Sequence, residues 1–117
     1  MAVLRPQHGF AAQDAVASLA RIDWTDDVPG VSVRETQIGR RRHAIVEYAA
    51  GAARAEWCRD GHAGLVLAGS IEYESRIASI ADGHRGRRLT LSTGRAHRGT
   101  NRDEGASRLF LIDDPAG

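Results

Sequence analysis

The stretch GRRLTLSTGRAHRGTN, residues 86–101, decides how this chain folds. Leu89 and Leu91 are separated by one residue, so in an extended segment both side chains point to the same face. Gly94 allows a sharp turn, and His97 follows at the start of a returning segment. The stretch therefore predicts two short strands joined by a turn, with the imidazole of His97 directed toward the interior.

Segments of the same kind continue on both sides of this stretch. Short alternating runs rich in β-forming residues predict strands over 31–38, 44–49, 64–67, 71–74, 89–91 and 109–112. The 13 glycines fall mainly at the joins between these runs, where tight turns need them. Residues 11–20 instead place apolar positions at helical spacing. We therefore expect an N-terminal arm over residues 1–30, with a short helix or loose order, followed by one antiparallel sandwich or barrel over residues 31–117.

The composition excludes several classes of protein. All 16 basic residues are arginine, and 15 acidic residues leave a net charge of +1, so we expect no nucleic-acid or membrane partner. Cys58 is the one cysteine, so no disulfide can form within the chain. The first ten residues contain no apolar run typical of a signal peptide, and we expect a cytoplasmic location. We interpret residues 40–43, RRRH, as a solvated loop or an edge guard, with contact to an anionic ligand or to nucleic acid as the alternative.

Fixed spacings in residues 86–101 resemble the second conserved motif of the cupin superfamily. That motif reads G-x5-P-x-G-x2-H-x3-N, and Gly86, Gly94, His97 and Asn101 all stand at the required positions. Ser92 takes the place of the usual proline. The resemblance implies an all-β fold, the double-stranded β-helix or jelly-roll barrel.

The first cupin motif, G-x5-H-x-H-x3,4-E-x6-G, can be read backward from Gly69. The three ligand positions are then occupied by Glu56, Cys58 and His62, so the spacing is kept while every ligand type differs. The opening glycine, Gly51, comes one residue late. This segment is similar to a cupin subgroup with Trp-Cys and Gly-His at these places. The resemblance covers residues 45–101, about half of the chain.

The same residues form a candidate site when they are considered without the family. Glu56 and Cys58 are two apart and would share a face in an extended segment, while an Asp-Gly turn can bring His62 back toward them. With His97 they offer four donors suited to Zn²⁺, Fe²⁺, Ni²⁺ or Cu²⁺. Two alternatives remain. Cys58 and His62 can be ordinary core residues, or Cys58 can be a nucleophile with His62 or His97 as its base, although no residue that would orient the base can be named.

These observations favour a small cupin-domain protein of unassigned activity, with a divalent-metal site or a small polar ligand site inside the barrel. The alternative is a metal-dependent enzyme, dioxygenase-like or isomerase-like, that acts on a small polar substrate. The changed ligand set argues against the best-known cupin oxygenase chemistries. Arg59, Arg95 and Arg98 flank the motifs and could hold an anionic ligand, or could be solvated rim charges. We also expect a homodimer, because the N-terminal arm could complete the sheet of a neighbouring copy.

Overall fold

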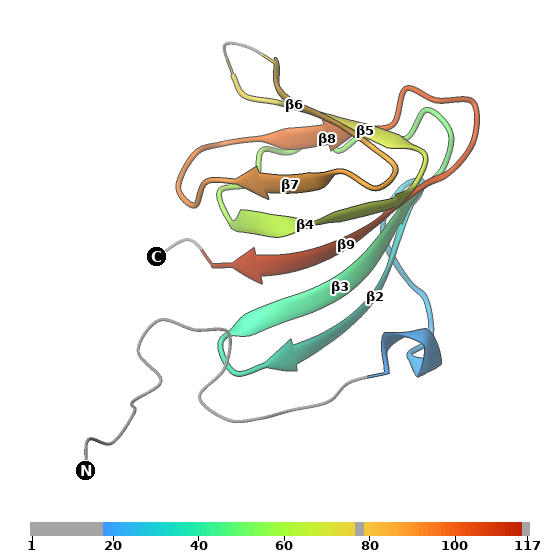
Figure 1. Cartoon of the computed structure of the whole chain (residues 1–117), viewed down its shortest axis with the longest axis vertical. Coiled ribbons are helices and arrows are strands. Elements are labelled where there is room, and N and C mark those ends of the chain that lie inside the picture. The colour runs from blue at the N-terminus through green and yellow to red at the C-terminus, as the bar shows by residue number, and fades with distance from the viewer. Residues whose placement is uncertain (1–17, 77–78, 116–117) are drawn as a thin grey trace.

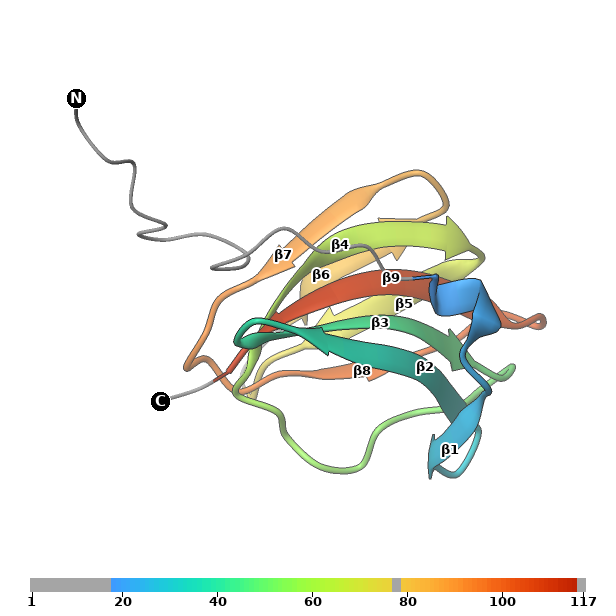
Figure 2. The same ribbon diagram turned by 90° about the horizontal axis from the view of Figure 1, so that it is seen from below.

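The computed structural model describes residues 18–76 and 79–115. In this part of the chain, a short 3-10 helix η1 (Leu19–Arg21) precedes nine strands that pair in antiparallel fashion (Figures 1 and 2). One sheet has the order β1-β2-β3-β9-β4-β7, and a second sheet has the order β6-β5-β8. The bounds are β1 Thr25–Val28, β2 Val31–Ile38, β3 Arg41–Tyr48, β4 Gly61–Ala68, β5 Ser70–Glu74, β6 Ser79–His84, β7 Arg88–Leu91, β8 Arg98–Thr100 and β9 Ser107–Asp114.

Strands β2 and β3 form a hairpin whose alternation supplies much of the core. Val33 pairs with Val46, and both side chains are buried, as is that of Tyr48. Gly39 has a φ of 63°, which lets the two strands turn within two residues. The inward face of this hairpin forms one wall of the interior, because successive side chains of a strand point to opposite faces.

The C-terminal strand β9 lies in the middle of the six-stranded sheet. It pairs with β3 on one side and with β4 on the other. Ser107, Leu109, Leu111 and Asp113 alternate along its buried face. An aspartate thus continues the apolar row of β9 into the interior of the fold.

The three-stranded sheet provides the opposite wall. Ile71 and Tyr73 of β5 are buried, and Tyr73 pairs with Gly99 of β8. Asn101 directly follows β8 and is fully buried. Its side-chain Nδ2 donates hydrogen bonds to the carbonyl oxygens of Tyr48, Ala49 and Gly105, while its Oδ1 accepts one from a backbone N–H. Asn101 therefore holds the end of β8 against the end of β3.

The predicted fold class is confirmed, and the six predicted runs lie in strands except for residue 49, which follows the end of β3. Strands β1 and β6 were not predicted, and β1 extends the sheet back to residue 25, inside the expected arm. The strand expected to return from His97 is β8, which pairs with β5 of the second sheet. Most of the expected helix over residues 11–20 lies outside the described residues. The interpretation of residues 40–43 as a loop is wrong, since residues 41–43 already belong to β3. No helix in the described part of the chain is long and apolar enough to cross a membrane.

Replacing Asn101 with alanine is expected to destabilise the fold strongly. The change leaves buried carbonyl groups without their donor, so we expect the free energy of unfolding to fall by about 3 kcal/mol. Urea denaturation measures the change, and Arg102→Ala, at an exposed neighbouring position, serves as the control. A loss of less than about 1 kcal/mol would show that the Asn101 hydrogen bonds do not hold the barrel together.

Candidate metal centre

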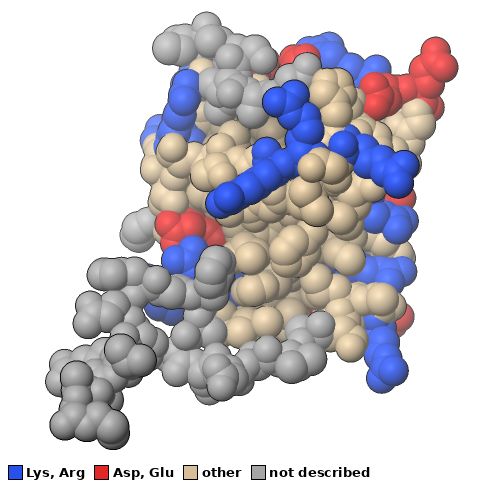
Figure 3. All heavy atoms as spheres, viewed as in Figure 1, with Lys and Arg blue, Asp and Glu red and all other residues tan. Residues whose placement is uncertain are grey.

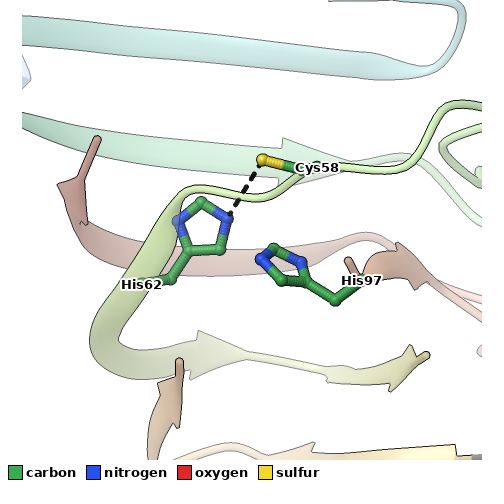
Figure 4. Close-up of side chains that lie close together, drawn as sticks. All are labelled: Cys58, His62 and His97. Atoms are coloured by element: carbon green, nitrogen blue, oxygen red, sulfur yellow. Dashed lines mark hydrogen bonds between the residues drawn. The ribbon is translucent and has the colours of Figure 1, made fainter. Parts of the chain in front are cut away.

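Three side chains from separate segments meet inside one end of the barrel. Cys58 lies in the connection between β3 and β4, where its backbone N–H and carbonyl exchange hydrogen bonds with those of His97. His62 is the second residue of β4 and pairs with Leu91 and with Asp113 in the sheet. The backbone pairing thus fixes Cys58 directly beside His97, and the sheet fixes His62 next to both (Figure 4).

The donor atoms of these three residues form a compact group. One ligand atom from each of Cys58, His62 and His97 lies within 4.8 Å of the others. The distance between Cys58 Sγ and His62 Nε2 is 4.0 Å, and the two imidazole rings are 4.8 Å apart at their centres. His97 is 1% exposed, whereas Cys58 and His62 are partly buried. The group can therefore be reached from one side and is closed on the other.

Glu56, the fourth expected ligand, does not belong to this group. The chain bends at Glu56, and its side chain is exposed. The expectation that Glu56 and Cys58 share a face required a continuous extended segment. The structure has only an isolated bridge at Cys58 instead. The three arginines expected at the rim differ in burial. Arg59 and Arg95 are exposed, whereas Arg98 is half-buried and donates hydrogen bonds to Glu74 and to the carbonyl of Ala55.

An acidic residue that the sequence analysis did not single out orients His62. Asp113 Oδ1 lies 2.7 Å from His62 Nδ1, and Asp113 Oδ2 accepts a hydrogen bond of 2.7 Å from Arg42, which also pairs with Glu35. Burial alone would raise the pKa of Asp113, but the hydrogen bonds and positive charges of His62 and Arg42 hold this pKa below its usual range. Asp113 is therefore a buried carboxylate with both oxygens engaged.

The two histidines differ in protonation. Burial lowers the pKa of His62, but hydrogen bonds to Asp113 and Cys58, together with their negative charges, outweigh it and raise the pKa to about 9. Burial lowers the pKa of His97, and its hydrogen bond with the carbonyl of Asp60 only partly offsets this. At neutral pH and without a metal ion, His62 is the charged imidazole and His97 is the neutral one.

The tautomer of His97 follows from its one hydrogen bond. Its Nε2 lies 2.7 Å from the backbone oxygen of Asp60, and because a carbonyl only accepts, Nε2 carries the proton and donates. The other nitrogen, Nδ1, keeps its lone pair, is buried, and has no hydrogen-bond partner in the part of the chain that the structure describes. A buried imidazole nitrogen without a partner is uncommon and is ready to bind a Lewis acid.

The group opens into a cavity of about 360 Å³. Its volume lies at the lower end of the range for small-molecule sites. The wall includes Tyr48, Arg54 and Tyr73 besides the three residues of the group and Asp113. Arg54 donates to the hydroxyl of Tyr48 and pairs with Asp27 at the cavity mouth. Chemically, the arrangement offers one thiol and two imidazoles beside a polar cavity.

Comparisons with known proteins establish the fold. No family model matches the chain, and no curated protein matches it by sequence. Among solved structures, KdgF from Halomonas sp. superposes with a TM-score of 0.69 at 15% identity, over 88% of this chain and 96% of the other. An RmlC-like cupin from Shewanella frigidimarina NCIMB 400 gives 0.70 at 11% identity, over 89% and 93%.

A third match is the cupin domain of Schizosaccharomyces pombe Cnp3, with a TM-score of 0.66 at 16% identity. It covers 83% of this chain, and this chain spans 66% of that one. The matches share the two-sheet barrel and little sequence. The fold expected from the motif spacing is thus the observed one, and this chain folds as a cupin.

Proposed function

We propose that this protein is a cupin that binds a transition-metal ion through Cys58, His62 and His97, with the remaining coordination positions open to a small polar ligand in the cavity. The observation that carries the proposal is the buried Nδ1 of His97, which has no hydrogen-bond partner among the described residues. It sits in a residue that is grouped with a thiol and a second imidazole. A bound cation would satisfy this lone pair.

The donor set and its surroundings fit such an ion. Two donors held by one ion at about 2.0–2.3 Å lie at most about 4.6 Å apart. The group within 4.8 Å, which counts one nitrogen of each imidazole, is only slightly wider than that. Asp113 fixes His62 through Nδ1, and the carbonyl of Asp60 fixes His97 through Nε2. Such outer hydrogen bonds orient the ligands of most protein metal sites.

The residue types favour borderline or soft ions. A thiolate with two imidazoles suits Zn²⁺, Fe²⁺, Ni²⁺ or Cu²⁺ better than Mg²⁺ or Ca²⁺, which prefer oxygen donors. The ion would act as a Lewis acid toward a ligand in the cavity. His62 and His97 would position the ion, and the cavity wall would select the ligand.

One observation favours a second candidate function, a nucleophilic thiol. Asp113 supplies the orienting group that the sequence analysis could not name, so that Cys58, His62 and Asp113 form a thiol–imidazole–carboxylate series. In this reading His97 has no role. Metal content separates the two candidates, since a nucleophilic site needs no ion.

Protein purified without an affinity tag is expected to contain about one transition-metal ion per chain. His97→Ala should weaken metal binding at least about 100-fold, because it removes a ligand that no neighbour replaces. Cys58→Ser should shift preference away from thiophilic ions, because it removes the soft donor. Elemental analysis and competitive chelator titrations measure both effects, and Glu56→Gln, outside the group, is the control. Equal affinity in wild type and His97→Ala would overturn the proposed site.

The metal-free protein is expected to lose stability as the pH rises through the range set by His62. A pKa raised from 6.5 to about 9 means that the folded state holds the proton more tightly than the unfolded state. The stabilisation is complete below about pH 6.5 and lost by about pH 9, and amounts to at most about 3 kcal/mol.

Denaturation in the presence of a chelator, repeated across this pH range, measures the loss. Asp113→Asn removes the partner of His62 and should flatten the profile. Asp114→Asn, the next residue on the opposite face of β9, should keep the wild-type profile. A profile that stays steep in Asp113→Asn would show that another group causes the pH dependence.

We further propose that the homodimer expected from the sequence forms through the outer face of the six-stranded sheet. On this face Phe110 lies beside Ile45 on β3 and beside Leu65 on β4, and Leu65 and Leu67 remain exposed. Figure 3 shows a broad uncharged region on this side, with arginines above it and along its edge. The salt bridges Arg41–Asp114 and Arg108–Glu47 offer charges of both signs to a second copy.

Analytical ultracentrifugation at micromolar concentration is expected to give the mass of a dimer. Leu65→Glu, which places a charge in the centre of the apolar row, should shift the protein toward the monomer. Ser92→Glu, at an exposed position after the end of β7 and outside the sheet, is the control and should leave the dimer intact. A wild-type protein that sediments as a monomer would contradict the proposal.

A further inference from the structure

The cavity beside the metal centre opens along β1. Most residues of its wall are buried or partly buried, and the exposed ones are Thr25, Asp26, Asp27 and Glu35. All four belong to β1 and β2, the two strands at one edge of the six-stranded sheet. His97 and Asp113, in contrast, lie at the buried end of the cavity. A ligand that enters from solvent therefore passes the edge formed by β1.

Residues 53–58 form the neighbouring edge of the second sheet. Isolated bridges pair Ala53 with Thr100 and Cys58 with His97, which places this segment alongside β8. The backbone N–H of Arg54 also donates to the carbonyl of Gly99 at 3.1 Å. Because β1 ends one sheet and β8 ends the other, a seam between the two sheets lies between β1 and residues 53–58.

One ion pair crosses this seam. Arg54 Nη2 lies 2.7 Å from Asp27 Oδ2, and the two side chains are 25% and 34% exposed. Nε of Arg54 donates to the buried hydroxyl of Tyr48 at 2.9 Å, which holds the guanidinium at the cavity wall. Among the described residues, no other side chain of β1 or β2 forms a hydrogen bond with residues 53–58. The pair is thus the polar contact that closes the entrance.

Asp27 is the half of the pair that is free to move. The pairing of β1 with β2 is irregular between Asp26 and Val28, and Asp27 has no partner residue in the register. Such irregularities interrupt pairing and redirect side chains. The ends of β1 are fastened, because Trp24 stacks on an arginine of β2 and the carbonyl of Gly30 accepts a backbone hydrogen bond. Opening therefore needs a movement at Asp27 and not of the whole strand.

We propose that Asp27 and Arg54 form a gate at the entrance to the cavity, and that small molecules reach Cys58 between β1 and residues 53–58 when this pair opens. The inference goes beyond the proposed function, because it holds whether Cys58 binds a metal ion or acts as a nucleophile. A partly exposed ion pair contributes little to stability, so it breaks far more often than the core unfolds. The gate can then set the rate of entry while the fold stays intact.

Labelling of Cys58 tests the gate, because this residue is the one cysteine of the chain and lines the cavity. The metal-free full chain is treated with dithiodipyridine, a neutral aromatic disulfide, and separately with iodoacetamide, which is smaller and also neutral. The thiolate of Cys58 attacks each reagent, and thiopyridone or iodide leaves. The ratio of the two rate constants cancels the reactivity of the thiol itself and reports the width of the entrance.

Asp27→Ala is expected to raise the rate of dithiodipyridine relative to iodoacetamide about fivefold, because the larger reagent gains most from the loss of the ion pair. Sodium chloride should raise this ratio in wild type, since it screens the pair, and should have no effect in Asp27→Ala. Glu72→Ala is the matched control, because it breaks an ion pair with Arg102 at a carboxylate that is 33% exposed and lies outside the cavity wall. An unchanged ratio in Asp27→Ala, or an equal rise in Glu72→Ala, would overturn the gate.

Urea separates opening of the gate from unfolding. Labelling that requires the chain to unfold speeds up steeply at low urea concentrations, whereas labelling through a local opening depends little on urea. We expect a weak urea dependence in wild type and in Asp27→Ala. A steep dependence in both would show that Cys58 is reached only by unfolding and would overturn the inference. Because the measurement uses no metal ion, a chain that fails to bind metal would contradict the proposed function and leave this test of the gate decisive.

Discussion

The insertion of β9 between β3 and β4 is the constraint on which both the barrel and the site depend. Strands β3 and β4 are connected by residues 49–60, yet the C-terminal strand separates them in the sheet. The connecting residues must therefore cross the end of the barrel, and this crossing brings Cys58 to His97. The same insertion places Asp113 directly opposite His62. Closing the sheet and assembling the site are one event, because neither local hairpin contains all the parts.

A buried carboxylate, Asp113, links the pairing of the three strands to the assembly of the site. Asp113 would be costly to bury alone, but Arg42 from one neighbouring strand and His62 from the other each engage one of its oxygens. The three residues thus tie β3, β9 and β4 together across the sheet. Because His62 is held through Nδ1, its Nε2 is the nitrogen left on the side of Cys58. The interaction that satisfies the core charge also fixes the donor of the site.

The sequence predicted the features that depend on local patterns, such as alternation and turn glycines. It missed those that depend on partners far away in the chain. The alternation over Val31–Ile38 defines β2 to the residue, and the glycine spacing before His97 places this histidine in the interior. Strand β8 was expected as the segment that returns from His97, but its pairing with β5 was not, because this partner strand lies far away in the sequence. Glu56 was misplaced because a bend interrupts the alternation. Asp113 was overlooked, although it continues the every-second-residue row of Leu109 and Leu111, because its partner His62 lies 51 positions away.

His97 distinguishes the two chemistries that the site geometry allows. A thiol nucleophile needs an imidazole and an orienting carboxylate, and His62 with Asp113 provides both. It does not need a second imidazole that is buried, neutral, and without a partner at Nδ1 among the described residues. Such a group lowers the stability of the fold unless something binds it. The structure nevertheless fixes His97 in place. Its backbone makes two hydrogen bonds with that of Cys58, and its imidazole donates one to the backbone oxygen of Asp60. The proposed metal ion would offset this cost, since it would bind the lone pair that has no partner among the described residues.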